Sequence, residues 1–559
     1  MVGRATLDPP YEYTHNDRVG GYSHPSSLAA IPPLGYNPAT MNGLRRTIGL
    51  ALLTLFALGL RVWVVLALST DHTRPLAYEH GCIAENLLAG KGFSIQFLGQ
   101  QGPTSQQSPF YPLLLAAFYR GLGTNSPAAI LGVQLLQCVA GAALVLMVVW
   151  LAWSLLPDRP SIGWIAGLME AVYPSHLYMV THLQVAIWAA LALTLLLAIV
   201  VSARWQATWT GAILAGVVAG TLLLVEPILC LAVPICAAVF WLGALRVRSD
   251  CRIKVDGERW TVAGNGDMGV VFSPANCRLP TADGVLRGSG IARASKQVAL
   301  MAAVATVIIA PWTIRNWLVH GEPVFIKSTF GYAFWQGNCP GSWGTDKVPK
   351  AVAEETRLTN DGTLRGIDRA LWEARYETVY IDDLALKPTG YRDFVGLSEP
   401  QRSRLLGARA WQFIRAHPSA YVHLCLKRLQ YFLLFDETNP KAANRLYRIS
   451  TVVWLVLGLV GLLVSWQQWR SLWPTYAIFL AVMLFHTLVI VSARFRIPVE
   501  PMSFVWASAA IAPLVVRLFA RRPIRVLRPG EVSRDPLPPQ PVLRGPHYRI
   551  IARRPGVRR

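Results

Sequence analysis

Charged residues are scarce in this sequence, and acidic ones are the scarcest. Only 15% of its 559 residues are Asp, Glu, Lys or Arg, whereas a soluble chain normally carries about a quarter. The mean hydropathy is +0.37, and the apolar residues gather in long runs. These features exclude an ordinary soluble globular enzyme and predict a chain that crosses a membrane several times.

Signatures of metal centres and disulfide frameworks are also missing. The eight cysteines include no CxxC pair and no zinc-ligand spacing, and several lie in apolar runs, where cysteine behaves as a small hydrophobe. We therefore expect that no cofactor is required; a divalent metal is conceivable but not indicated. The first apolar run begins near Ile48, after a polar, Pro-rich stretch, so a cleavable signal peptide is not expected.

Positive charge is abundant, with a formal net charge of +22. The end of the chain concentrates it: from Arg517 onward there are twelve arginines against Glu531 and Asp535. This block directly follows an apolar run. Basic residues beside a membrane span are typical of cytoplasmic loops and suit anionic lipid headgroups, so nucleic acid is not expected as a partner.

The apolar runs predict an all-α polytopic membrane protein. Each run is close to the roughly 20 residues that cross the hydrocarbon core. We predict about ten transmembrane helices, near residues 47–69, 126–156, 162–180, 183–203, 208–225, 227–246, 297–314, 449–466, 473–492 and 497–519.

Lys and Arg in the short loops fix the expected orientation. Arg159, Arg204, Arg470 and the Arg-rich tail fall on one side if ten spans alternate, and that side is the cytoplasm. We expect a multi-pass protein of the plasma (inner) membrane with both termini cytoplasmic. The predicted parts are a flexible cytoplasmic arm (1–46), an N-terminal bundle (47–246) with a first outer loop (70–125), a cytoplasmic insert (247–296), a transmembrane helix (297–314), an outer-face region (315–447), C-terminal transmembrane helices (448–519) and a basic cytoplasmic tail (520–559).

Several shorter patterns predict local structure. The apolar segment 109–119 is too short to span and favours an interfacial helix. Segment 411–424 is typical of an amphipathic helix broken at Pro418. In the insert, alternation around Asp256-Gly257 predicts a hairpin. The GxGxxG of residues 264–269 is followed by a strand-like VVFSP rather than a helix, so we interpret it as a chance match.

Several motifs occur in an order that resembles a known family. Tyr78-Glu79-His80, Asn86-Leu87-Leu88 and Gly90-Lys91-Gly92-Phe93 resemble the first loop of C-type-fold membrane glycosyltransferases, the superfamily of protein O-mannosyltransferases and lipid A aminoarabinose transferases. Further elements of this pattern are Ser108–Pro112 (SPFYP), Ala310–Asn316 (APWTIRN) and Gly331–Asn338 (GYAFWQGN). The resemblance implies interfacial helices in the first outer loop, a small outer helical region and an active site at the outer face.

The resemblance also implies a reaction, in which a polyprenyl-phosphate carrier donates its sugar to an acceptor hydroxyl with inversion. The acceptor needs a carboxylate base within reach. Glu79 fits the family's acidic position, and we expect it to be the base and to be partly buried. Asp71, at the exit of the first span, is the alternative.

The phosphate that leaves the sugar needs cations beside it. Arg315, Arg494 and Arg496 lie at predicted outer ends of spans, and Lys91 is a weaker candidate. Tyr111, in the SPFYP element, and Glu226, before Pro227, are further possible site residues.

A departure from the family pattern occurs at Gln184, where relatives commonly carry an acidic residue. It weakens the case for a second carboxylate or a shared metal. His176 and His182, six residues apart, are interpreted as interface histidines rather than metal ligands.

The predicted function is thus transfer of a hexose or pentose from a polyprenyl-phosphate donor to a glycolipid, glycan or protein acceptor. Besides a scaffold that has lost activity, which the departure at Gln184 keeps open, two alternatives stay open. One is a transporter or flippase of lipid-linked saccharide, which would place ionisable groups at mid-bilayer, where Arg61 and Glu226 are the clearest examples. The other is an oligosaccharide polymerase or ligase that uses a pyrophosphate carrier.

Overall fold

The computed structural model describes residues 38–249, 253–256, 259–262, 271–272, 283–349, 363–376 and 378–519. The chain forms two compact units, Met1–Leu52 and Leu53–Arg559. Of the first unit the structure describes the beginning of helix α1 (Pro38–Ala67). All that follows concerns the second unit.

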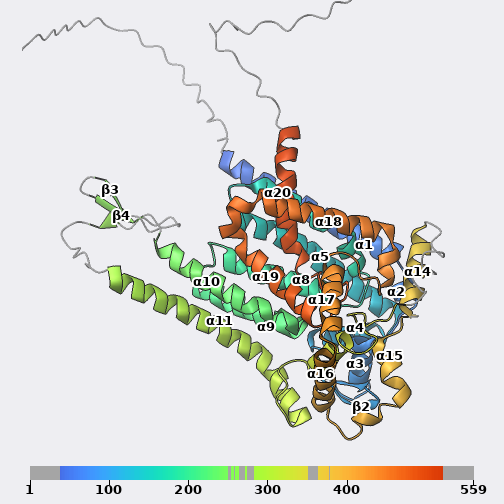
Figure 1. Ribbon diagram of the computed structural model, residues 1–559. Helices are drawn as coiled ribbons and strands as arrows, with labels where there is room; N and C mark the ends of the chain where they lie inside the picture. Colours follow the sequence, from blue (N-terminus) through green and yellow to red (C-terminus); the bar gives the residue numbers. More distant parts are fainter. Residues whose placement is uncertain are drawn as a thin grey trace, which may run out of the picture. The chain divides into compact units, whose positions relative to one another are not determined.

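The second unit is built from helices, as the sequence predicts (Figure 1). Its bundle contains the rest of α1, α5 (Pro127–Leu155), α6 (Pro160–Val172), α8 (Ala186–Val201), α9 (Trp209–Val225), α10 (Ala232–Ser249), α11 (Asp283–His320), α18 (Arg445–Val464), α19 (Trp469–Leu488) and α20 (Glu500–Phe519). Helices α5, α8, α9 and α11 pack successively against one another, and α18 packs against α20. The all-α polytopic prediction is confirmed.

Six of the described helical segments are long and apolar enough to cross a membrane. They are Leu44–Ala67, Pro127–Leu155, Pro227–Leu245, Gly290–His320, Arg445–Val464 and Trp466–Leu488. Three shorter apolar helical segments, Ala186–Val201, Trp209–Val225 and Glu500–Val515, match further predicted spans. The total of ten stays a prediction.

Two predicted spans differ from the helices observed. The continuous helix expected over 162–180 is wrong, because α6 ends at Val172 and the short helix α7 (Pro174–Met179) begins after an extended Tyr173. Proline disfavours the helical conformation in the residue before it, which explains the break. The span predicted at 297–314 is the middle of the longer α11, which continues through Pro311.

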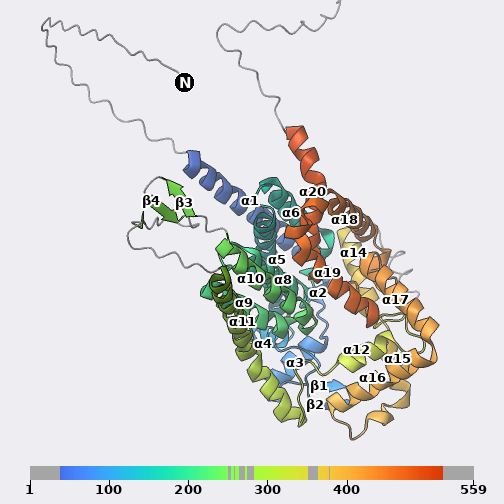
Figure 2. The ribbon, with the colours of Figure 1, turned by 60° about the vertical axis from the view of Figure 1, so that its left-hand side comes forward.

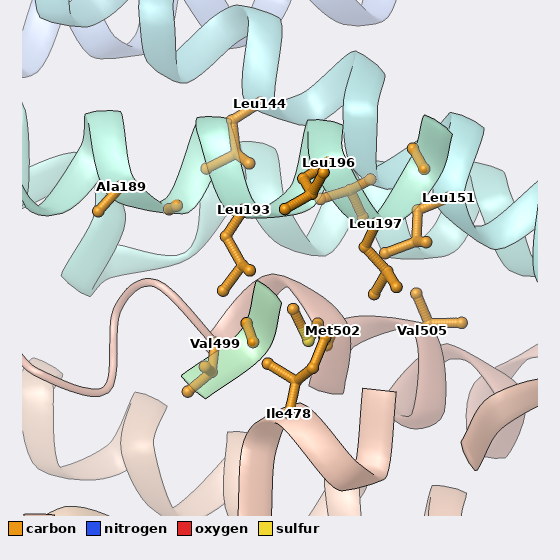
Figure 3. Close-up of a cluster of buried hydrophobic side chains, with 14 of the residues drawn as sticks. Leu144, Leu151, Ala189, Leu193, Leu196, Leu197, Ile478, Val499, Met502 and Val505 are labelled. Atoms are coloured by element: carbon orange, nitrogen blue, oxygen red, sulfur yellow. The ribbon is translucent and has the colours of Figure 1, made fainter. Parts of the chain in front are cut away.

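The core of the bundle is a layer of branched apolar side chains. Figure 3 shows where α5, α8 and the C-terminal helices meet. The buried side chains there include Leu144, Leu151, Ala189, Leu193, Leu196, Leu197, Ile478, Val499, Met502 and Val505. This packing fixes the ends of α8 and α20, whose preceding loops carry the site described below.

Smaller elements gather at one end of the bundle (Figure 2). They include α2 (Thr70–Thr73), α3 (Glu79–Leu88), the antiparallel strands β1 (Ser94–Phe97) and β2 (Gln100–Pro103), α4 (Phe110–Leu122), α12 (Phe330–Gly337), α14 (Leu364–Tyr376), α15 (Ile381–Ala385), α16 (Glu399–Ala416) and α17 (Pro418–Leu433). The helix predicted at 109–119 corresponds to α4, and the predicted break at Pro418 separates α16 from α17. The β1–β2 hairpin was not predicted.

The insert contains the predicted hairpin. Strand β3 (Ile253–Asp256) pairs with β4 (Arg259–Val262), which pairs with β5 (Val271–Phe272). The GxGxxG at 264–269 lies outside the described residues.

Candidate active site

An open cleft lies where the first loop, the segment after α7, residues 346–347, helix α14 with residues 378–380, and the segment before α20 meet. It encloses about 1070 Å³ of empty space that includes open solvent. Its charged and polar lining includes Asp71, Tyr78, Glu79, Tyr178, His182, Gln184, Asp346, Lys347, Arg375, Tyr380 and Arg494. Three residues singled out from the sequence, Glu79, Asp71 and Arg494, thus share one cavity.

Asp71 is already occupied by partners from two directions. Its Oδ1 accepts a hydrogen bond from Arg375 Nη2 at 2.6 Å, and its Oδ2 lies 3.3 Å from His182 Nδ1. Helix α14 also carries Asp368, two turns before Arg375 on the same face of the helix, and its carboxylate accepts a hydrogen bond from the backbone N–H of Thr70 at 2.8 Å. Burial raises the pKa of Asp71, and Arg375 pulls it back. This carboxylate therefore pins α2 to α14 rather than facing the cleft as a free base.

The carboxylate of Glu79, unlike that of Asp71, is exposed. Tyr78 is extended and Glu79 is the first residue of α3, where the helix dipole favours a carboxylate. The side chain is exposed, so the expectation that Glu79 is partly buried is wrong. Among the residues that the structure describes, none donates a hydrogen bond to its carboxylate, which leaves it able to reach a hydroxyl in the cleft.

Besides Arg375, which is paired with Asp71, two cations face the same cavity from separate segments. Arg494 donates from Nη1 to Gln184 Oε1 at 2.8 Å, and both residues are half-buried. Gln184, unlike a carboxylate, leaves the guanidinium charge uncompensated. Lys347 is held in place because residues 346–348 pair with 379–381: Ile381 N–H donates to Asp346 O at 3.0 Å and Val348 N–H to Val379 O at 3.1 Å.

The pKa values of two tyrosines in the cleft, Tyr78 and Tyr380, are affected by both its negative and its positive side chains. Burial raises the pKa of Tyr380; Asp346 and Glu79 add to the rise, and Arg494 opposes it. Burial likewise raises the pKa of Tyr78, where Arg375 and Arg494 oppose while Asp71 and Glu79 add. Both phenols therefore stay protonated at neutral pH. The Glu79 carboxylate and the Arg494 guanidinium thus act on both phenols, and all four side chains line the same cavity.

Comparison with known proteins gives structural matches of low identity. The chain resembles oligosaccharyltransferase AglB from Archaeoglobus fulgidus, whose structures include an apo form (TM-score 0.41, 13% identity, 83% of this chain and 51% of that chain) and a complex with an inhibitory peptide and dolichol-phosphate (TM-score 0.41, 15% identity, 83% and 50%). It also resembles ArnT from Cupriavidus metallidurans bound to undecaprenyl phosphate (TM-score 0.32, 15% identity, 81% and 76%).

Both matched proteins are membrane glycosyltransferases of the C-type fold. This is the family that the sequence motifs resemble. The chain spans about half the length of the archaeal enzyme. No family model and no curated protein matches the sequence. The superpositions are loose, so the functional assignment below rests on the residues of the cleft.

Two of the arginines predicted to bind phosphate do not line the cleft. Arg315 donates from Nη1 to Thr104 O at 2.6 Å and from Nη2 to Phe93 O at 2.9 Å. It therefore ties the β1–β2 hairpin region to α11. Arg496 is buried; its Nε binds Glu500 Oε1, and its Nη1 donates to Phe432 O at 2.9 Å. Because backbone carbonyls and a carboxylate occupy these donors, the structure favours anchoring roles for both.

The remaining sequence candidates are also outside the cleft. Lys91 is exposed beyond the end of α3. Glu226 lies between α9 and the 3₁₀ helix η1 (Pro227–Leu231), with Oε1 3.6 Å from Lys327 Nζ. Tyr111 is fully buried and donates to Gln137 Oε1 at 2.6 Å. The local partner or position of each residue accounts for it without a role in binding substrate or in catalysis.

The sequence reading missed Arg375, Lys347 and Tyr380. All three lie in the predicted outer-face region 315–447, in which only the end of the 310–316 element and the 331–338 element carried a motif. Within the described residues no three His, Cys, Asp or Glu side chains cluster as a metal site would require.

Proposed function

We propose that the chain is a glycosyltransferase that moves a sugar from a polyprenyl-phosphate donor to an acceptor hydroxyl at the cleft. The observation that carries this proposal is the convergence of one exposed carboxylate, Glu79, and two cations, Arg494 and Lys347, on a single cavity at one end of an apolar bundle. We further propose that this end faces away from the cytoplasm.

In this proposal Glu79 accepts the proton of the acceptor hydroxyl as its oxygen attacks the anomeric carbon. The bond between that carbon and the phosphate oxygen breaks, and its electron pair leaves with the lipid phosphate. Attack from the face opposite the leaving group inverts the anomeric centre. Arg494 and Lys347 stabilise the charge that grows on the phosphate. The protonated phenol of Tyr380 is a further donor in the cavity.

No metal is needed in this scheme because two side-chain cations supply the positive charge. Asp71 is not assigned as the base, since Arg375 and His182 already engage both of its oxygens. The transferred unit is proposed to be a single hexose or pentose.

The proposal is tested by comparing lipid extracts and surface glycans of cells with and without the gene by mass spectrometry. We expect deletion to remove one glycosylated product and to raise the level of a polyprenyl-phosphate monosaccharide. Accumulation of a pyrophosphate-linked oligosaccharide would instead identify an oligosaccharide ligase or polymerase. An unchanged set of glycans and carriers would refute the assignment.

A further inference from the structure

A chain of five ionisable side chains runs through the interior of the bundle. Arg61 of α1 binds Glu170 of α6 (Nη2 to Oε1, 3.2 Å), and Glu170 Oε1 lies 2.8 Å from Nδ1 of His176. The other ring nitrogen, Nε2, lies 2.8 Å from Oε2 of Glu500, and Glu500 Oε1 binds Nε of Arg496. All five side chains are buried. We call this set the charged brace.

The central imidazole is the link that joins the two halves of the brace. Each ring nitrogen of His176 faces a carboxylate oxygen, and an ionised carboxylate can only accept hydrogen bonds. With both carboxylates ionised, both nitrogens carry hydrogen and His176 is a cation between two anions. Removing a partner from such a buried set leaves an uncompensated charge, which is strongly unfavourable.

Helix ends help to hold the outer members of the brace. Arg61 donates to the carbonyls of Glu170 (3.2 Å) and Ala171 (3.3 Å) in the last turn of α6. Arg496 donates to the carbonyls of the last turn of α17. Glu500 is the first residue of α20. Arg61, Arg496 and Glu500 thus each meet a helix end of opposite partial charge, whereas Glu170 lies in the last turn of α6 and depends on Arg61 and His176.

The brace joins two segments that both reach the cleft. His176 belongs to α7, and the segment that follows it brings Tyr178, His182 and Gln184 to the cavity. Arg496 lies two residues after Arg494, which binds Gln184 at 2.8 Å. The two segments are therefore tied in the interior by His176–Glu500 and at the cleft by Gln184–Arg494. Just before α7, Tyr173 also donates a hydrogen bond to Glu500 Oε1 at 3.4 Å.

We propose that His176 is a positioning residue: by joining Glu170 to Glu500 it fixes the 489–499 segment so that Arg494 faces the donor phosphate. The part that concerns the phosphate rests on the proposed function, whereas the part that concerns the segment does not. His176 itself does not line the cleft and acts only through Arg494.

The experiment uses the full chain in lipid nanodiscs and the variants His176→Gln, Arg494→Ala and their combination. Hydrogen exchange of the backbone amides is measured by mass spectrometry, and undecaprenyl phosphate is the binding probe. His320→Gln, at the end of α11 with its ring 2.8 Å from Ser105 Oγ, serves as the control. We expect His176→Gln to speed exchange in 489–499 and to weaken binding about tenfold, the loss typical of a hydrogen bond to a charged group, while the control leaves exchange in 489–499 unchanged.

The double variant separates positioning from general destabilisation. If His176 acts through Arg494, the combination binds no more weakly than Arg494→Ala alone. The proposal would be overturned if the losses of lipid affinity multiply in the double variant. It would also be overturned if His176→Gln speeds exchange uniformly across the bundle or leaves exchange in 489–499 unchanged. Should His176→Gln not fold, Glu170→Gln removes one of the two negative charges that hold the ring. It is expected to speed exchange in 489–499 as well, and unchanged exchange there counts equally against the brace. If the unaltered protein does not bind the lipid but His176→Gln still loosens 489–499, the brace stands and the phosphate assignment falls.

Discussion

Replacing Arg375 by Met should expose how the two candidate carboxylates of the cleft differ. Met keeps much of the volume of the arginine but removes the guanidinium that donates to Asp71 Oδ1 at 2.6 Å. Asp71 would then keep only His182, 3.3 Å away. We expect the variant to be less stable, because a largely buried anion loses its main partner.

The magnitude follows from burial. Breaking a fully buried ion pair by removing one partner costs about 3–5 kcal/mol. The side chains of Asp71 and Arg375 are 14% and 20% exposed, and His182 remains beside Asp71. We therefore expect a smaller loss, about 2 kcal/mol. Removing both charges with Asp71→Asn and Arg375→Met should recover most of this loss, since no unpaired ion remains.

The assay is the thermal midpoint of the detergent-solubilised chain for the two single variants and the double. We expect Arg375→Met to have the lowest midpoint and the double variant to lie above it. A double variant that is less stable than Arg375→Met would refute the interpretation of Asp71 as a structural anion and would return it as a candidate base.

Two other predictions concern stability. Burial, with help from the positive charges of Lys327 and Arg494, lowers the pKa of His80 from 6.5 to about 3. Because the unfolded chain binds the proton first, the folded state is favoured above pH 6.5 and loses about 2 kcal/mol of stability between pH 7 and pH 5. His80→Gln should therefore flatten the fall in thermal midpoint over that range, while the same change at an exposed histidine should not. A methyl group on Gly461 would lie 1.9 Å from the carbonyl oxygen of Trp506, whereas one on Gly458 meets nothing within 4 Å. Gly461→Ala should therefore push α18 from α20 and cost about 1–3 kcal/mol of stability. Equal thermal midpoints for Gly461→Ala and Gly458→Ala would contradict this packing.

The fold could be predicted further than the site could. Long apolar runs report directly on helices that cross a membrane, and proline positions predicted the break at Pro418. The same rule, applied to Pro174, would have divided the run at 162–180. The β1–β2 hairpin escaped prediction because its turn uses Leu98 and Gly99 at positive φ, and leucine is not a residue that signals such a turn.

The predicted side of the membrane placed Glu79, Asp71 and Arg494 in the same region. It could not separate residues that face a cavity from residues that anchor a loop. Arg315 and Arg496 look alike in the sequence, and only their carbonyl partners assign them to anchoring. Arg375 and Lys347 gave no signal because their placement depends on α14 packing against α2 and on the pairing of 346–348 with 379–381. The pairing within the charged brace was likewise invisible, since Glu170, His176 and Glu500 come from separate helices.

The central claim is that Glu79 removes the proton from the acceptor. The most direct measurement is a mass-spectrometric survey of surface glycans and glycolipids in a deletion strain complemented with the unaltered gene, with Glu79→Gln or with Glu85→Gln, a matched change on the same helix outside the cleft. The glycosylated species lost on deletion should return with the unaltered gene and with Glu85→Gln but not with Glu79→Gln. Its full return with Glu79→Gln, at equal protein abundance, would contradict the account.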